Sequence, residues 1–421
     1  MTPLKTAIYG ILISTIIVIT GCSSSSSDSN DNDNDDSISA ITYSTTSTRG
    51  DYSEWSISGN DLSAEWQVVN ESGQIDFIYT IEATCGTSDE FGIKVCSIST
   101  ASCTNGVAVC GDMPSGSLEM MDIPGLALFV NSEDAGVDKQ LHVGFAKNAN
   151  ACSDNVSGDY TFIRTGLGLN ENFGMYRSDS DFVNIMHSDF GFDTADGNVT
   201  QSVAYRTGTE SETLTDGGCV DGVRFRTAGG SDLRSMMTES GLFVLDLPAG
   251  QGGLISFKIN QAASLSDFAG KTLGGISFPD NDDPSPILAT LGTVSADKIE
   301  ITLGVAGSTS TLHLMDLGTA DSLTNPSYPD FTDTPGGYDS AALSADYPNP
   351  DSIPGLFKIE DPTDSGRVIL AGMKFNGKVI GIGMVYNERN TSDIDPSAGD
   401  GVTTFDADGL YNTGNFIIFE M

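Results

Sequence analysis

Gly125-Leu-Ala-Leu-Phe-Val130, Gly241-Leu-Phe-Val-Leu-Asp246 and Gly355-Leu-Phe-Lys-Ile-Glu360 are three copies of one short motif, a glycine followed by an apolar run. They recur at intervals of 116 and 114 residues. Each is followed by a second apolar stretch of strand length, at 141–145, 254–259 and 368–375. Self-similarity at a fixed period is typical of a repeated structural unit. This repeat decides the expected fold.

A second glycine motif keeps a similar period. It reads Gly-Asp-Tyr-Ser at Gly50, Gly-Asp-Tyr-Thr at Gly158, Gly-Lys-Thr-Leu at Gly270 and Gly-Lys-Val-Ile at Gly377. Hairpins with an acidic residue before glycine follow it, most clearly at 192–197 and 405–409. The predicted unit therefore spans about 110 residues, with copies at 125–225, 241–320 and 355–421 and a partial copy at 40–110.

These patterns predict an all-β protein of two similar antiparallel lobes, residues 38–230 and 236–421. One unit offers about five strands, too few to bury a sheet, whereas two units give enough strands for a barrel or a sandwich of lipocalin-like size. No sustained helical pattern occurs outside residues 232–239, and glycine is abundant at 48 residues. The alternative is chance similarity among glycine-rich strands, but the regular intervals favour the repeat.

The N-terminus predicts export. Lys5 precedes an apolar run from Ile8 to Ile19, which ends in Thr20-Gly21-Cys22. A short basic region, an apolar stretch and small residues before a cut site form a signal peptide, here residues 1–21. A transmembrane helix is the alternative, but a span needs about 20 apolar residues.

The Ile-Thr-Gly-Cys22 ending resembles the lipobox of bacterial lipoproteins. The resemblance implies cleavage after Gly21, diacylglycerol on the Cys22 sulfur and a fatty acyl chain such as palmitate on its amine. Two or more acyl chains give stable membrane anchoring. Because Ser23 rather than aspartate follows, the resemblance also implies sorting to the outer membrane, on its surface or its periplasmic face.

Residues 22–37 form the predicted tether, in which Cys22 precedes a run of Ser, Asp and Asn with no apolar side chain up to Asp36. Such a segment cannot bury surface to offset its chain entropy, so we expect a disordered linker. A calcium loop is the alternative interpretation, but the turn glycine and the distal glutamate of an EF-hand are missing.

The remaining six cysteines predict three disulfides, because an even number in an exported chain reads as a disulfide framework. Spacing favours Cys85–Cys96, Cys103–Cys110 and Cys152–Cys219 among the fifteen possible pairings. A zinc site is the alternative, but no C-x₂₋₄-C knuckle is present. The C-terminal lobe contains no cysteine and must rely on its core.

The formal net charge of −39 excludes nucleic acids and anionic lipid surfaces as good partners. Solubility outside the cell explains this charge, and loose binding of divalent cations is the alternative.

Catalytic motifs are missing from the sequence. There is no Gly-x-Ser-x-Gly elbow, no His-Glu-x-x-His and no P-loop. His142 and His313 alternate with apolar neighbours, which predicts that both face solvent, and His187 is uninformative. Residues 404–409 resemble half of a calcium loop but are interpreted as a hairpin. We therefore predict no catalytic residue, no cofactor and no metal site.

Three classes of function remain. The first is a non-catalytic envelope lipoprotein that binds a small or polymeric ligand, or another envelope protein, through its β lobes. The second is a structural or adhesive surface protein, and the third is a carboxylate-based hydrolase. Residues 320–355, with six prolines among four aromatic residues, are the favoured ligand-contact surface, and a structural insertion is the alternative.

Overall fold

The computed structural model describes most of the chain from residue 40 onward. The described residues are 40–89, 91–137, 139–153, 155–166, 173–179, 181–192, 199–201, 211–228, 230–238, 241–247, 251–279, 285–295, 298–305, 308–317, 354–361, 364–388 and 410–421. The predicted signal peptide, Cys22, the linker, the half calcium loop and nearly all of the segment 320–355 lie outside them.

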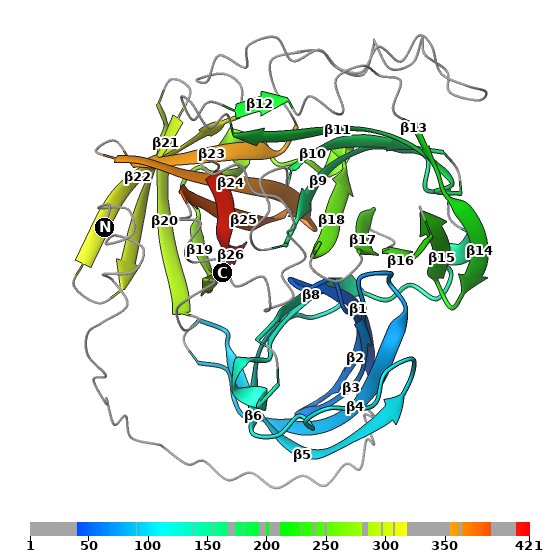
Figure 1. Cartoon of the computed structure of the whole chain (residues 1–421). Coiled ribbons are helices and arrows are strands. Elements are labelled where there is room, and N and C mark those ends of the chain that lie inside the picture. The colour runs from blue at the N-terminus through cyan, green and yellow to red at the C-terminus, as the bar shows by residue number, and fades with distance from the viewer. Residues whose placement is uncertain are drawn as a thin grey trace, which may run out of the picture.

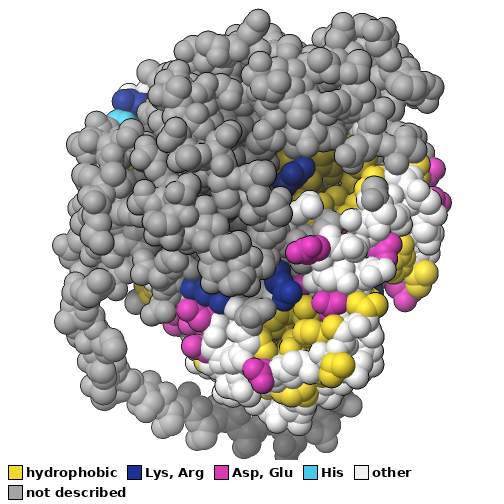
Figure 2. Space-filling view, viewed as in Figure 1, with side chains coloured by type: hydrophobic (Ala, Val, Ile, Leu, Met, Phe, Trp, Pro, Cys, Tyr) yellow, Lys and Arg dark blue, Asp and Glu magenta, His cyan; other side chains and the backbone are white. Residues whose placement is uncertain are grey.

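Barrel A is a closed, eight-stranded meander in which β8 pairs back onto β1 (Figure 1). Its strands are β1 (Ile41–Ser47), β2 (Tyr52–Ser58), β3 (Asp61–Val69), β4 (Ile75–Cys85), β5 (Lys94–Asn105), β6 (Ser117–Ile123), β7 (Ala127–Asn131) and β8 (Leu141–Ala146). A 3-10 turn, η1 (Glu133–Ala135), lies between β7 and β8. In Figure 2, where barrel A is the lower unit seen end on, apolar side chains gather within its rim.

Barrel C repeats the same topology, with β26 paired back onto β19. Its strands are β19 (Thr272–Pro279), β20 (Ser285–Ser295), β21 (Lys298–Val305), β22 (Ser308–Asp316), β23 (Leu356–Asp361), β24 (Asp364–Phe375), β25 (Lys378–Glu388) and β26 (Leu410–Glu420). The two closed antiparallel barrels confirm the predicted all-β fold with two similar lobes.

Sheet B lies between the barrels in the sequence. It contains β9 (Gly158–Arg164), β10 (Phe173–Ser178), β11 (Asn184–Phe192), β12 (Val199–Gln201), β13 (Ser211–Thr213), β14 (Thr215–Val220), β15 (Val223–Ala228), β16 (Ser231–Met237), β17 (Leu242–Asp246) and β18 (Gly253–Lys258). Only Leu214 separates β13, which pairs with β11, from β14, which pairs with β15. The sheet therefore curls into a third, barrel-like unit.

Sheet B changes the position of the lobe boundary. β15 and β16 pair from Val223–Met236 to Ala228–Ser231, so the predicted division between residues 230 and 236 falls within one sheet. The links between units lie instead at 147–157, which contains η2 (Ala151–Ser153), and at 259–271, which contains η4 (Ile259–Gln261) and the short helix α2 (Leu265–Phe268). Tight turns allow eight short strands within residues 41–146. A stretch about as long as one repeat period therefore closes a barrel by itself, whereas we expected that two repeat units would be needed.

The glycine motif has equivalent positions in two of its three copies. Gly125 precedes β7 and Gly241 precedes β17, each the strand before the last of its unit, and both glycines have positive φ (72° and 81°). Gly355 precedes β23, which is the fifth strand of barrel C. The third copy is therefore out of phase with the other two.

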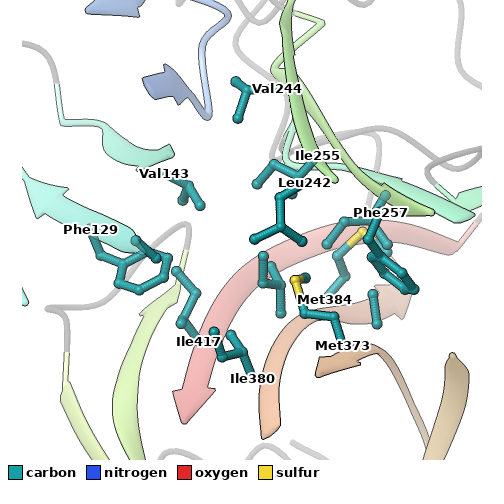
Figure 3. Packing of buried hydrophobic residues seen from close by; sticks show 14 of the residues in the cluster. Phe129, Val143, Leu242, Val244, Ile255, Phe257, Met373, Ile380, Met384 and Ile417 are labelled. Carbon is teal, nitrogen blue, oxygen red and sulfur yellow. The ribbon is translucent and has the colours of Figure 1, made fainter. Parts of the chain in front are cut away.

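The three units share one apolar core, which we call the common core. It is built from outward-facing side chains of the barrels and one face of sheet B (Figure 3). Its members include Phe129 and Val143 of barrel A, Leu242 and Ile255 of sheet B, and Met384 and Ile417 of barrel C. All six are at most 1% exposed. Burying a side chain of this size contributes about 1.5–3 kcal/mol, so this core holds the units together.

The interiors of the two closed barrels differ in chemistry. Barrel C is filled with aliphatic residues such as Leu273, Ile301 and Leu314. Barrel A encloses the aromatic residues Tyr43, Trp55, Trp66 and Tyr79, together with buried hydroxyl groups and His142.

The predicted disulfides are confirmed, and they join Cys85 to Cys96, Cys103 to Cys110 and Cys152 to Cys219. Cys85 and Cys96 are directly opposite each other on β4 and β5. The third bridge ties η2 in the first link to β14 of sheet B. Bridges of this kind typically contribute 2–4 kcal/mol.

Each closing seam depends on a glycine. A Cβ at Gly144 would overlap the Ser44 carbonyl oxygen, and one at Gly275 would overlap that of Ile417. We predict that Gly275→Ala destabilises the protein by about 1–3 kcal/mol, because the seam strands must move apart. Gly292→Ala on β20 is the control, since its Cβ would make only ordinary contacts. Urea unfolding measures both, and equal midpoints for the two variants would contradict the prediction.

Candidate functional site: the mouth of barrel A

The mouth of barrel A is the end formed by the turns after β1, β3, β5 and β7. It holds a cavity of about 290 Å³, lined by Arg49, Trp66, Val68, Phe77, Tyr79, Gly111, Asp112, Gly136, Val137 and Gln140. Ligand sites are usually concave, mostly apolar and supplied with a few placed polar groups. The mouth cavity has this composition, with three aromatic rings and a small number of polar side chains.

A buried carboxylate organises the floor of the cavity. Asp51 Oδ2 accepts hydrogen bonds from Trp66 Nε1 (2.9 Å) and Gln140 Nε2 (2.8 Å), and Asp51 Oδ1 accepts one from the Val69 amide (3.0 Å). Burial raises the pKa of Asp51, against the lowering effects of the Arg49 charge and of these donors. The carboxylate therefore fixes the orientation of two lining side chains, the Trp66 indole and the Gln140 amide.

Gln140 brings an acceptor to this floor. Its amide nitrogen is held by Asp51, which assigns the opposite atom, Oε1, as the oxygen. Gln140 is 1% exposed, and Oε1 accepts no hydrogen bond from the described residues. A buried acceptor without a donor costs about 1–3 kcal/mol.

The rim of the mouth is pinned by the second disulfide. Cys103 lies opposite Tyr79, two residues before the end of β5, and Cys110 closes the following loop onto it. The Asn105 side chain accepts a hydrogen bond from the Cys110 amide (3.0 Å), and Tyr79 Oη donates to the Asp112 carbonyl (2.8 Å). The loop that supplies Gly111 and Asp112 is therefore held against the barrel.

His142 lies deeper inside barrel A, and the prediction that it faces solvent was wrong. The side chain is 0% exposed. Its neighbours Leu141, Val143 and Phe145 face the common core, so β8 is buried on both faces. His142, which alternates with them, therefore points into the barrel. His313 lies on β22, where it is only half-buried, while Leu312 and Leu314 belong to the interior of barrel C. His187 lies on β11, opposite Tyr176, and its side chain is outside the described part of the structure.

His142 has one hydrogen-bond partner and an aromatic environment. Its Nδ1 is 3.0 Å from Ser53 Oγ, and the Trp66 ring packs edge-on at 4.6 Å between centroids. Nε2 has no hydrogen-bond partner among the described residues. Burial lowers the pKa of His142 to about 3, so the ring is neutral at physiological pH.

Serine, histidine and aspartate thus meet inside one barrel without forming a catalytic triad. In a triad the carboxylate orients the histidine, whereas Asp51 accepts its hydrogen bonds from Trp66, Gln140 and Val69. Ser53 Oγ also accepts a hydrogen bond from Trp55 Nε1 (2.9 Å), and both Ser53 and His142 are 0% exposed. The arrangement supports the floor of the mouth cavity and gives a substrate no access to the serine.

The described residues contain no group of three or more His, Cys, Asp or Glu side chains placed to hold a metal ion. None of the helices in the described part of the chain has the length and apolar character needed to cross a membrane.

The solved structures that are similar to this chain are distant neighbours, two of which are named below. No protein-family model and no curated protein matches the chain. A protein of unknown function from the DUF3598 family of Nostoc punctiforme is 8% identical, with 91% of this chain and 95% of that chain covered and a TM-score of 0.23. A porin-like protein from Bacteroides uniformis is also 8% identical with the same coverage and a TM-score of 0.17. Scores this low do not establish a shared fold, so the function must be argued from this chain's own residues.

We predict that His142 makes the protein acid-sensitive. In the unfolded chain His142 binds a proton below about pH 6.5, whereas in the folded protein it stays neutral down to about pH 3. Because the unfolded state binds more protons between these values, the free energy of unfolding falls as the pH is lowered from 6.5 to 3. The difference of 3.5 pH units corresponds to roughly 5 kcal/mol at most. His142→Gln should flatten this part of the profile of unfolding free energy against pH.

The control for this prediction is His313→Gln in barrel C. Burial raises the pKa of Asp246 to about 7, although its ion pair with Arg234 lowers it. Asp246 therefore changes the free energy of unfolding with pH in the opposite direction to His142, but it does so equally in wild type and in both variants. Urea unfolding at pH 4, 5, 6 and 7 gives the slopes. Parallel profiles for wild type and His142→Gln would show that the prediction fails.

Proposed function

We propose that this protein is a membrane-anchored envelope lipoprotein, without catalytic activity, that binds a small ligand or the end of a polymer at the mouth of barrel A. The observation that carries the proposal is the mouth cavity of barrel A. The described interior residues of barrel C form an apolar cluster of mainly aliphatic side chains with Phe357 and Phe416, whereas the turns of barrel A enclose about 290 Å³. That volume is near the lower end of the range for small-molecule sites.

The walls of the cavity indicate the chemistry of the ligand. Phe77, Val137 and the edge of Trp66 offer apolar contact, while Gln140 offers an acceptor and Arg49 a cation. A compact apolar or aromatic group that carries one hydroxyl or amide N–H would fit these features. The three donors to Asp51 hold the floor before a ligand arrives, which reduces the ordering cost of binding.

The proposed anchor rests on the lipobox of the sequence. A diacylglycerol and a palmitate-like chain on Cys22 would hold the protein at the outer membrane, and residues 22–37 would space the barrels from the surface. The net charge of −39 would repel the body from anionic lipid and from nucleic acid, so the lipid on Cys22 is the proposed membrane attachment and nucleic acid is not a proposed partner.

A structural or adhesive surface protein is the alternative, and one surface feature favours it. Val107, Val109 and Met113 are 39–80% exposed, and all three belong to the loop after β5. Exposed apolar residues that lie near one another can mark a contact with another protein. A carboxylate-based hydrolase has less support, because the buried Asp51 is already bonded to three protein donors.

The anchor is tested by Cys22→Ala. We expect the variant to lose palmitate labelling in cells and to accumulate as the uncleaved precursor, because the sulfur that receives the diacylglycerol is gone. Ser23→Thr is the control and should be processed normally. Labelling of Cys22→Ala at the wild-type level would refute the anchor.

Ligand binding is tested through the two tryptophans of the chain. Trp66 lines the mouth cavity, whereas Trp55 lies in the interior of barrel A and does not line it. In protein labelled with ¹⁵N-tryptophan, we expect members of a library of small apolar and aromatic compounds to shift the Trp66 indole signal more than that of Trp55. Gly111→Phe should abolish the shifts, because a Cβ at Gly111 has open space around it and the ring would fill the cavity.

The matched control is Gly292→Phe on the exposed face of β20 in barrel C, where a Cβ also makes only ordinary contacts. It should leave the shifts unchanged. If no compound moves the Trp66 signal, or if Gly111→Phe still responds like wild type, the mouth is not a ligand site.

A further inference from the structure

A second hollow lies where the three units meet, and we call it the junction groove. Its volume is about 700 Å³, within the range of ligand sites. Barrel A and the link after it contribute Lys147 and Asn150, the second link contributes Gln261, and barrel C contributes Lys374, Phe375 and Asn376. Clefts between packed units are a frequent location of binding sites.

The lining of the junction groove is unusual for this chain. None of its described residues is acidic, although the sequence contains 58 aspartates and glutamates. Side-chain amides take their place, at Asn148, Asn150, Gln261 and Asn376. An amide both donates and accepts hydrogen bonds, so it matches hydroxyl groups, which do the same.

The two lysines add donors without making the groove strongly cationic. Lys147 Nζ lies 2.7 Å from Glu54 Oε1, and Lys374 Nζ lies 3.2 Å from Asp267 Oδ2. Each of these ion pairs uses one of the three N–H groups of an ammonium and offsets its charge. A neutral ligand with many hydroxyls therefore suits the groove better than a polyanion does.

The walls of the groove are held in place by their own backbone. Asn376 and Gly377 have φ of 47° and 79°, as a two-residue hairpin turn requires, and Phe375 pairs with Lys378 across that turn. On the opposite side, the Ala146 amide donates to the Leu126 carbonyl (2.7 Å) and the Lys147 amide donates to that of Thr42 (2.7 Å). The half-buried Phe375 packs on the common core.

We propose that the junction groove binds a neutral saccharide, with the amides and lysines bonding its hydroxyls and Phe375 contacting the apolar face of a sugar ring. The site is separate from the mouth of barrel A and shares no lining residue with it. It would allow one molecule to bind an extended glycan and a small ligand at the same time.

Isothermal titration of the full chain with maltotriose, cellotriose and chitotriose tests the proposal. We expect saturable binding of at least one of these neutral trisaccharides. Lys374→Met and Asn376→Gly should each weaken it by roughly tenfold, the effect of losing a hydrogen bond to a charged or well-placed group. Asn376→Gly keeps the positive φ of the turn, so it tests the side chain even if Lys374→Met misfolds.

Lys378→Met is the matched control, because Lys378 lies on the same hairpin but does not line the groove. The affinity of this variant for the trisaccharide should stay within about twofold of wild type, a smaller change than the loss of one hydrogen bond causes. Trigalacturonate and inorganic phosphate should bind more weakly than the neutral sugars. The proposal is overturned if no neutral trisaccharide binds, if either acidic probe binds more tightly, or if both groove variants bind like Lys378→Met.

Discussion

The apolar faces of β7 and β8, of β17 and β18, and of β24 to β26 meet in the common core, so each of these strands is buried on both sides. This shared apolar contact explains why the three units pack against one another instead of forming separate domains joined by linkers. It also bears on where the two proposed binding sites lie. One side of every unit is committed to the common core. The mouth cavity lies at a barrel end and the junction groove lies at a seam between the units.

Barrels A and C show that one topology can serve two purposes. Both are eight-stranded meanders closed by pairing of the first and last strands, and both need a glycine at the closing seam. Barrel C uses its interior for aliphatic packing and gains stability without any disulfide. Barrel A places a buried aspartate, a histidine and two tryptophans inside and has two bridges of its own. Buried polar groups lower stability unless they are hydrogen-bonded. In barrel A the hydrogen bonds to Asp51 and the two disulfides offset this cost.

Part of this fold was predictable from the sequence, and the limits have physical causes. The period of the glycine motifs, the all-β class and the pairs Cys85–Cys96 and Cys103–Cys110 follow from local spacing, because hairpin turns and short disulfide loops are local structures. The number of strands in a unit was underestimated because strands such as β1, rich in Ser and Thr, lack an apolar signature. His142 was misplaced because alternation shows which residues share a face but not whether the other face is also covered. The mouth cavity and the junction groove join residues from distant turns, which no local pattern reveals.

In all three units the first and last strands are neighbours. β1 pairs with β8, β9 with β18 and β19 with β26, so the chain enters and leaves each unit at nearly the same place. A unit with adjacent ends can be copied in tandem through short links, without rerouting the chain or unpairing a strand. Once copies lie side by side, each outward apolar face finds a partner in the next, and each interior is free to diverge. The geometry is therefore compatible with tandem duplication, and it leaves the interiors of barrels A and C free to differ in chemistry as they do.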